Sequence, residues 1–295
     1  MEDANLIWTE QPVLDNPLMI LGFSGWSNGG EVPSSILWYL LSRFDAKIIA
    51  ELKTDGFYTY NMGRADAKRP LVEIENGMIR AFTAQTLTFW AHKAELGGKD
   101  LILVSCPEPE LNWNSLTKSI INVAKYYDVE KIVMLGGMFD SIPHTAPPRI
   151  QGLANYLTLR DELTDHGIEP VNYKGPSSIY GLVMIESTKN DIPAVSLWAS
   201  TPHYIQVTNF IGCYNMMLKL NELYELNIDL EVASQDSKYL YQQINDAIKK
   251  KPELAEYLKT LEKDLHRGSA ATPEEPINKN IIKEIEDLFK DIPGQ

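Results

Sequence analysis

The sequence predicts an α/β fold, in which a mostly parallel β-sheet is sandwiched by helices and followed by a C-terminal helical extension. Two observations support this fold class. Residues 1–230 alternate short apolar runs with longer, helically periodic ones, as repeated strand–helix units do. Residues 231–295 hold 13 acidic and 10 basic residues in 65 positions, a denser charge than in the preceding segment. We therefore expect an α/β domain over 1–230 and a helical extension over 231–295.

The first elements are indicated by the length and spacing of their apolar residues. Leu18–Phe23 is too short for a buried helix and precedes a glycine-rich stretch, so we expect a core strand. Residues 31–44 place apolar side chains on one helical face, and Lys47–Leu52 again has the length of a strand. The dipeptide Asn76-Gly77 separates two further apolar runs, which predicts a β-hairpin.

The alternation of strands and helices then continues to residue 225. We expect a strand at Leu101–Cys106, a helix over 114–127, a strand at Lys131–Leu135, a helix over 177–189, a strand at Ala194–Trp198 and a helix over 208–225. Repeated units of this kind form a parallel sheet whose two faces are both covered by helices.

The tail has a different pattern, that of amphipathic helices. One apolar stripe consists of Tyr239, Leu240, Ile244, Ala247 and Ile248, and a second helix begins at Pro252 with Leu254, Tyr257, Leu258, Leu261 and Leu265 on one side. Residues 268–276 form a linker, and residues 281–289 predict a last amphipathic helix. Such stripes must be buried against the α/β domain or a partner subunit.

Composition excludes several classes of protein. The 295 residues are 44% hydrophobic, which suffices for a sizeable core, and the net charge of −13 argues against nucleic-acid binding. The N-terminus, Met1–Asn5, lacks the basic start of a signal peptide, and no apolar run approaches the ~20 residues that cross a bilayer. Two cysteines, Cys106 and Cys213, fit a reducing compartment. We expect a cytoplasmic protein without membrane or nucleic-acid partners.

The loop after the first core strand is the first candidate for a site, because ligands of parallel sheets bind beyond the carboxyl ends of the strands. It contains Gly25, Trp26, Asn28, Gly29 and Gly30 and leads directly into a helix. Glycines permit close backbone approach, and a helix N-terminus offers free N–H groups to an anion. The alternative is a tight strand-to-helix turn. The loop matches neither dinucleotide nor nucleoside-triphosphate fingerprints.

Three further strand ends carry polar side chains. Glu108 and Glu110 follow one strand and predict either an acid–base or metal-binding pair, or a solvated or capping role. Asp140 stands four residues before His144, so the carboxylate could orient the imidazole, although the proline-rich loop around Thr145 could also be structural. A last strand end supplies the pair His203-Tyr204. Two histidines without a third ligand make a weak zinc site, and we expect no metal and no cofactor.

The loops are more specific as an ordered set than singly. They are Gly25-Trp26-Ser27-Asn28-Gly29-Gly30, Pro107-Glu108-Pro109, Pro143-His144-Thr145-Ala146-Pro147, Gly175-Pro176-Ser177-Ser178-Ile179-Tyr180-Gly181 and Trp198-Ala199-Ser200-Thr201-Pro202-His203-Tyr204. In this order the set resembles the prokaryotic members of the proteasome assembly chaperone 2 family, over roughly residues 5–265.

The resemblance implies a fold like that of purine nucleoside phosphorylases and hydrolases, with C-terminal helices, and self-association into homo-oligomers. It further implies a chaperone-like role toward protein clients or a proteasome-like assembly. Archaeal relatives that bind proteasomes end in a hydrophobic residue, a tyrosine and any residue. This chain ends in Ile292-Pro293-Gly294-Gln295 and departs from that pattern.

Two other functions stay open, of which the enzymatic one is suggested by analogy with the implied fold. The chain could be a phosphorylase-, hydrolase- or ligase-like enzyme with a pocket at the carboxyl ends of the strands. In such an enzyme the groups that bind an anion, transfer protons and orient substrate would be Asn28, Gly29, Gly30, Glu108, His144, His203 and Tyr204. The loops could also only pack together as a scaffold. We expect the protein-binding function rather than an enzyme.

Overall fold

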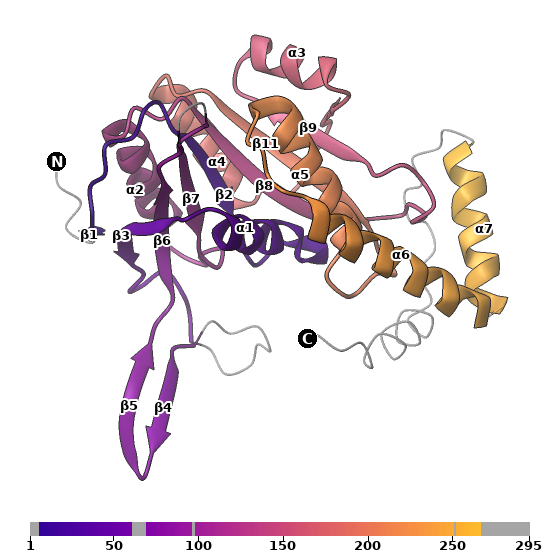
Figure 1. Ribbon diagram of the computed structural model, residues 1–295, viewed down its shortest axis with the longest axis horizontal. Helices are drawn as coiled ribbons and strands as arrows, with labels where there is room; N and C mark the ends of the chain where they lie inside the picture. The colour runs from indigo at the N-terminus through magenta and orange to yellow at the C-terminus, as the bar shows by residue number, and fades with distance from the viewer. Residues whose placement is uncertain (1–5, 61–68, 96–97, 251, 267–295) are drawn as a thin grey trace.

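The computed structural model describes residues 6–60, 69–95, 98–250 and 252–266. It is built around a nine-stranded sheet with helices on both sides, which confirms the α/β fold (Figure 1). Across the sheet the strands follow the order β1 (Leu6–Trp8), β3 (Lys47–Lys53), β6 (Thr86–His92), β7 (Leu101–Ser105), β2 (Leu18–Gly22), β8 (Lys131–Asp140), β11 (Ala194–Pro202), β9 (Ile150–Ala154) and β10 (Glu169–Pro170).

The sheet is mixed rather than uniformly parallel. The central strands β7, β2, β8 and β11 run parallel to one another, and each was predicted from its apolar run. The neighbours outside them, β6 and β9, pair antiparallel with β7 and β11. The predicted strand Lys47–Leu52 is also present as β3, which pairs antiparallel with β1 and β6. Sequence patterns had not indicated β1, β6, β9 or β10.

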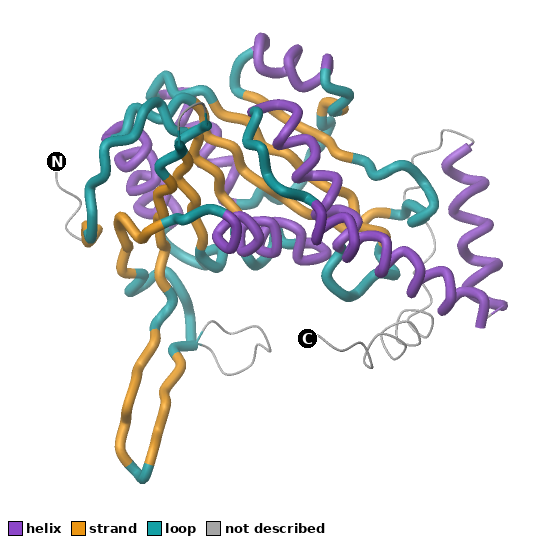
Figure 2. Tube along the Cα trace, viewed as in Figure 1, coloured by secondary structure: helices purple, strands orange, loops and turns teal. Residues whose placement is uncertain are grey.

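Alternating side chains of the central strands bury two separate layers. In β2, Met19 and Leu21 belong to one apolar cluster, whereas Leu18 and Ile20 belong to the other. This alternation follows from the two-residue period of a strand. All four side chains are buried, because helices cover both faces of the sheet (Figure 2).

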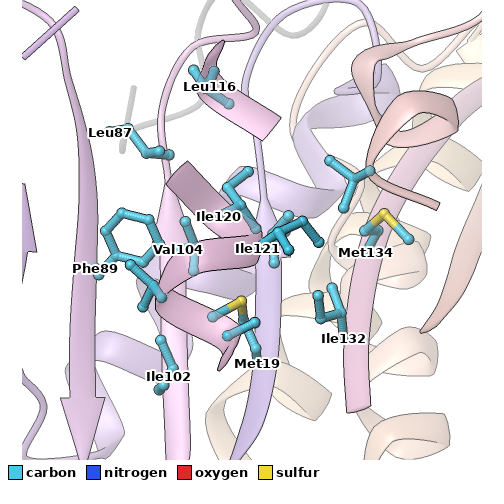
Figure 3. Packing of buried hydrophobic residues seen from close by; sticks show 14 of the residues in the cluster. Met19, Leu87, Phe89, Ile102, Val104, Leu116, Ile120, Ile121, Ile132 and Met134 are labelled. Atoms are coloured by element: carbon cyan, nitrogen blue, oxygen red, sulfur yellow. The ribbon is translucent and has the colours of Figure 1, made fainter. Parts of the chain in front are cut away.

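Each layer is completed by two long helices. On one face, α2 (Trp113–Tyr126) and α4 (Ile179–Lys189) contribute to the cluster that contains Met19. Figure 3 shows Leu116, Ile120 and Ile121 of α2 against the strands. On the other face lie α1 (Val32–Arg43) and α5 (Phe210–Tyr224), together with Leu163 of the short helix α3 (Leu157–Asp165). The predicted helices over 31–44, 114–127, 177–189 and 208–225 are therefore confirmed.

A two-stranded hairpin projects from the body of the molecule (Figure 1). It consists of β4 (Leu71–Glu75) and β5 (Met78–Thr83), joined at Asn76-Gly77 as predicted. Both turn residues have positive φ angles, 51° and 76°, which is the geometry that the Asn-Gly pair favours. Among the described residues, β4 and β5 pair only with each other.

The last described helices, α6 (Glu231–Lys250) and α7 (Pro252–His266), form a third apolar cluster with the end of β11. Leu240, Ile244, Leu254 and Leu261 are buried there, as the predicted stripes require. Tyr239 was expected in the same stripe, but it is half exposed. The predicted linker over 268–276 and helix over 281–289 lie outside the described residues. Within the described part, no helix combines the length and apolar character needed to span a bilayer.

Asp100 lies directly before β7, at the edge of the sheet where the parallel strands begin, and joins neighbouring segments there. Its carboxylate accepts hydrogen bonds from Lys93 Nζ at 2.6 Å and from the backbone N–H groups of Ala94 and Asp15 at 2.8 and 2.7 Å. Burial alone would raise the pKa of this carboxyl, but the hydrogen bonds and the charge of Lys93 outweigh it, and the pKa lies below its usual value. The carboxylate therefore stabilises the folded chain while it is ionised.

We expect Asp100→Asn to lower the free energy of unfolding by about 1–3 kcal/mol at pH 7, because buried donors lose a charged acceptor. Since the folded pKa is depressed, this stabilisation is present above about pH 4 and is lost as the pH falls through the folded pKa. Urea unfolding at pH 7 and pH 3 tests this expectation. The difference in free energy of unfolding between wild type and variant should be smaller at pH 3 than at pH 7. An equal difference at both pH values would contradict a stabilising role of the ionised Asp100 carboxylate.

Candidate functional site

The loops that follow β7, β2, β8 and β11 meet at the carboxyl edge of the sheet. Ser24 forms a parallel bridge with Pro107, and Asn28 forms one with Gly137. Between the loops after β8 and β11, the backbone N–H of His203 donates to the carbonyl oxygen of Asp140 at 3.1 Å. The expected convergence of these strand-end loops is therefore present.

Glu108 ties the first two loops to a helix. Its Oε2 accepts from the backbone N–H of Trp26 at 3.2 Å, and its Oε1 accepts from the N–H of Ile179 at 2.8 Å, at the first residue of α4. Burial raises the pKa of Glu108, and the two hydrogen bonds oppose that rise. Gly25, at φ 111°, permits the approach, since a Cβ there would lie 3.1 Å from the Cβ of Glu108. Glu108 thus acts as a cap and cross-link.

The remaining residues of the glycine loop, Asn28, Gly29 and Gly30, contact other parts of the same chain. A Cβ on Gly29 would lie 2.7 Å from the carbonyl oxygen of Gly137, and one on Gly30 would lie 2.6 Å from Thr201 Oγ1. Both glycines are buried, so they allow the turn to pack directly on β8 and β11. Asn28 Oδ1 accepts from the N–H of Ser34 in the first turn of α1, at 3.1 Å. The loop was interpreted either as an anion-binding site or as a tight strand-to-helix turn, and its geometry is that of a tight turn.

The loop after β8 carries His144 and Thr145 beneath the C-terminal helices. The N–H of His144 donates to the Tyr204 hydroxyl at 2.6 Å, and its Nδ1 lies 2.7 Å from the same oxygen. Its Nε2 faces Asn245 Oδ1 of α6 at 3.4 Å, while Thr145 Oγ1 donates to Glu262 Oε1 of α7 at 2.7 Å.

His203, directly after the end of β11, makes the corresponding contacts. Its Nδ1 lies 3.2 Å from the carbonyl oxygen of Asp140, and its Nε2 lies 2.7 Å from the hydroxyl of Tyr257 in α7. Burial lowers the pKa of His203, against the opposing effect of Asp140. Burial also lowers the pKa of His144, against a hydrogen bond that its Nε2 makes to Asn245 Oδ1 and the charge of Glu262. Both rings are therefore expected to be neutral at pH 7.

Of the two interpretations of the Asp140–His144 loop, the pairing of the carboxylate with the imidazole is not present. Its carboxylate accepts from the N–H of Ser141 at 2.8 Å and from Ser200 Oγ at 3.1 Å, and Arg149 Nη1 lies 3.7 Å away. Through its carbonyl oxygen Asp140 contacts His203 instead. Four residues of separation do not bring the two side chains together, because β8 continues to Asp140 and the chain turns only afterwards.

The histidine end of the site is closed by the chain itself. The ring of Tyr204 packs edge-on against His144, His203 and Tyr257, with centroid distances of 5.9, 5.7 and 6.5 Å. The cavity beside His144 measures about 20 Å³, which is room for about one water molecule. Within the described residues, no group of three or more His, Cys, Asp or Glu side chains could hold a metal ion.

Sequence reasoning missed the partners that α6 and α7 supply, namely Asn245, Tyr257 and Glu262. A signal for one of them was present. Tyr257 belongs to the apolar stripe of α7, and a half-buried tyrosine usually finds a hydrogen-bond partner for its hydroxyl. Asn245 and Glu262 carry no such signal, since both residue types are common on exposed helix faces.

Comparison with known proteins supports the family that the loops suggested. The model of the PAC2 family matches residues 22–248. The chain belongs to the PAC2 family. Its matched region runs from the end of β2 to α6, so the PAC2 match includes every strand-end loop of the site. No functionally curated protein matches the sequence.

Solved structures show the same PAC2 fold. A PAC2 family protein from Streptomyces avermitilis is 26% identical, covers 82% of this chain and 99% of its own, and superposes with a TM-score of 0.72. A proteasome-assembly chaperone homologue from Mycobacterium tuberculosis is 22% identical with the same coverage and TM-score. PbaB of Pyrococcus furiosus, an archaeal proteasome activator, is 16% identical over 82% of this chain and 97% of its own, with a TM-score of 0.62.

Proposed function

We propose that this chain is a self-associating protein that binds partner proteins in the manner of an assembly chaperone. PAC2 membership supports the chaperone-like class, and the similar folds include a proteasome-assembly chaperone homologue and a proteasome activator. A proteasome-like assembly is the client that these similarities favour. The free, buried thiols of Cys106 and Cys213 fit a reducing compartment, and we propose the cytoplasm.

The observation that carries the proposal is the exposed apolar surface of the β4–β5 hairpin. Val72 pairs with Phe82, and Ile74 pairs with Ile79 one step nearer the turn. Val72 and Ile74 lie on the same side of β4. A register shift between Glu73 and Ile74 places Ile79, rather than Arg80, opposite Ile74, so the four paired side chains form one apolar face. Their exposed fractions run from 48% to 69%. A face of this kind on a projecting element indicates a protein contact.

A second copy of the chain is the partner that best fits this hairpin. An isolated two-stranded hairpin is marginally stable in water, so covering its exposed apolar face with that of a second copy would stabilise it. The carboxylates of β4 do not oppose this contact, because Glu73 and Glu75 alternate to the other side from Val72 and Ile74, and Arg80 Nε lies 3.0 Å from Glu75 Oε2. Two hairpins placed face to face would form the self-complementary contact of a symmetric oligomer.

We expect Ile74→Asp to convert the oligomer to a monomer of 33.3 kDa, because a charge in the centre of an apolar contact loses its solvation. Size-exclusion chromatography with light scattering measures the mass. Thr83→Asp is the matched control, since Thr83 is also exposed but pairs with Leu71 on the other side of the hairpin. Equal masses for wild type and Ile74→Asp would contradict the proposal, as would dissociation by Thr83→Asp alone.

The enzyme alternative is not favoured by a specific observation. The cavity beside His144 has the volume of about one water molecule, and Asn245 of α6 and Tyr257 of α7 contact the rings of His144 and His203. The groups proposed to bind an anion, Asn28 and Gly29, are used to cap α1 and to pack on β8.

A further inference from the structure

His144 and His203 each contact one of the two C-terminal helices through a ring nitrogen. His144 Nε2 lies 3.4 Å from Asn245 Oδ1 of α6, and His203 Nε2 lies 2.7 Å from the hydroxyl of Tyr257 in α7. The ring of Tyr204 packs edge-on against both imidazoles. The protonation of the two imidazoles therefore bears directly on how α6 and α7 are held at the strand ends.

The hydrogen bonds of His144 specify a neutral ring with its proton on Nε2. Asn245 donates through Nδ2 to the carbonyl oxygen of Tyr241 at 2.9 Å, so its Oδ1 is the atom that faces the ring. An amide oxygen only accepts, and Nε2 therefore carries the proton. Nδ1 then accepts from the Tyr204 hydroxyl, whose oxygen also accepts from the backbone N–H of His144. The ring of Tyr241 packs on the same imidazole at a centroid distance of 5.4 Å.

A second proton on His144 is incompatible with this arrangement. On Nδ1 it would point at the Tyr204 oxygen, so the hydrogen of that hydroxyl would have to turn away from the ring. Tyr204 is 5% exposed and lies in the apolar cluster that contains Leu240 and Leu261. A buried imidazolium and a buried hydroxyl hydrogen without an acceptor are both unfavourable.

His203 is also held as a neutral ring, with its proton on the other nitrogen. Its Nδ1 faces the carbonyl oxygen of Asp140 at 3.2 Å, and a carbonyl oxygen only accepts, so Nδ1 carries the proton. Nε2 then accepts from the hydroxyl of Tyr257. Protonation of Nε2 would force the hydrogen bond to α7 to reverse its direction.

Carboxylates near the two rings favour protonation, but burial outweighs them. The charge of Glu262 on α7 acts on His144, and the charge of Asp140, which lies 3.7 Å from Arg149, acts on His203. Burial nevertheless lowers the pKa of both imidazoles from the ordinary value of about 6.5. The rings accept protons less readily with α6 and α7 docked than they would in water.

We infer that His144 and His203 form a pH-sensitive switch, which holds α6 and α7 on the strand ends while both rings are neutral and releases them when the rings are protonated. Because the docked state binds protons less readily than a state with solvated rings, its stability is complete above about pH 6.5 and falls as the pH drops below that value. Release would uncover Ile205, Ile244 and Leu254, which are buried in the cluster that the two helices form with the end of β11.

Hydrogen–deuterium exchange of the full chain at pH 7.5 and pH 5.5, corrected for the pH dependence of intrinsic exchange, measures the release. Detached helices of this length are marginally stable in water. The protection factors of α6 and α7 amides should therefore be at least about fivefold lower at pH 5.5, whereas those of β2 and β7 should change less than about twofold.

A double variant that combines His144→Gln and His203→Gln removes the titrating groups, because a glutamine amide makes hydrogen bonds but does not take up a proton in this pH range. It should protect α6 and α7 equally at both pH values. His166→Gln is the matched control. His166 follows α3 and contacts the carbonyl oxygen of Glu162 in that helix, so this variant should keep the pH dependence of the wild type.

NMR titration of the imidazole rings in the wild type is an independent measurement. The midpoints of His144 and His203 should lie below about 6.5. The inference is overturned if the wild type protects α6 and α7 equally at both pH values, if the loss persists in the double variant, or if both midpoints reach about 6.5 or more. Should the double variant fail to dock its helices at pH 7.5, the exchange and the midpoints of the wild type decide.

Discussion

Gly137→Ala is expected to lower the free energy of unfolding by about 3 kcal/mol or more, at the upper end of overpacking effects. A Cβ on Gly137 would lie 2.1 Å from the carbonyl oxygen of Gly29 and 3.1 Å from its carbonyl carbon. Both atoms belong to the backbone, so no side chain can rotate away. β8 lies between β2 and β11 and cannot shift without breaking a hydrogen-bonded ladder on each side. Urea denaturation of the purified chain measures the loss.

Gly167→Ala provides the control for Gly137→Ala. Gly167 has a φ of 72°, and a Cβ there would meet no atom within 4 Å. Its substitution should cost only the backbone strain of a left-handed residue, about 1 kcal/mol. A Gly137→Ala variant that is no less stable than Gly167→Ala would show that the glycine loop and β8 are not in the close contact described.

Tyr204→Ala should release the C-terminal helices from the strand ends. The substitution removes a buried ring that packs on His144, His203 and Tyr257, together with the acceptor of the His144 N–H. Loss of a buried aromatic ring costs about 3–5 kcal/mol. Hydrogen–deuterium exchange measures the consequence: amides of α6 and α7 should exchange much faster, while those of β2 and β7 stay protected.

The conservative variant Tyr204→Phe keeps the ring and removes only the hydroxyl. We expect a loss of about 1–3 kcal/mol, from the unsatisfied N–H of His144, with α6 and α7 still docked. Unchanged exchange of α6 and α7 in Tyr204→Ala would contradict the closure of the histidine site by these helices.

The parts of the fold that the sequence predicted are those with a strong local pattern. β2, β7, β8 and β11 are buried on both faces and are therefore continuous apolar runs. The missed elements lack such a pattern. α3 buries only Leu163 and has no apolar stripe, and β9 is a short strand with only two buried residues. In β6, Leu87, Phe89 and Ala91 do alternate with less apolar neighbours, a signal that was available and was not used.

The site was less predictable, because its contacts join residues far apart in the chain. Glu108 is 82 residues from Trp26 and 71 residues from Ile179, its two hydrogen-bond partners. Spacing within a loop suggested an Asp140–His144 pair, but the partner of His144 is Tyr204, 60 residues away. Only the general rule that parallel strands gather their loops at one edge placed these residues together. The domain boundary near residue 230 stays a prediction.

We propose that this chain assembles with copies of itself through the β4–β5 hairpin and presents a protein-binding surface. Native mass spectrometry of the full chain at low micromolar concentration tests the first half most directly. The predicted result for the wild type is a single species with a mass of two or more times 33.3 kDa. In Ile74→Asp the mass should fall to that of one chain. A wild type that is found only as one chain, at every concentration measured, would contradict the claim.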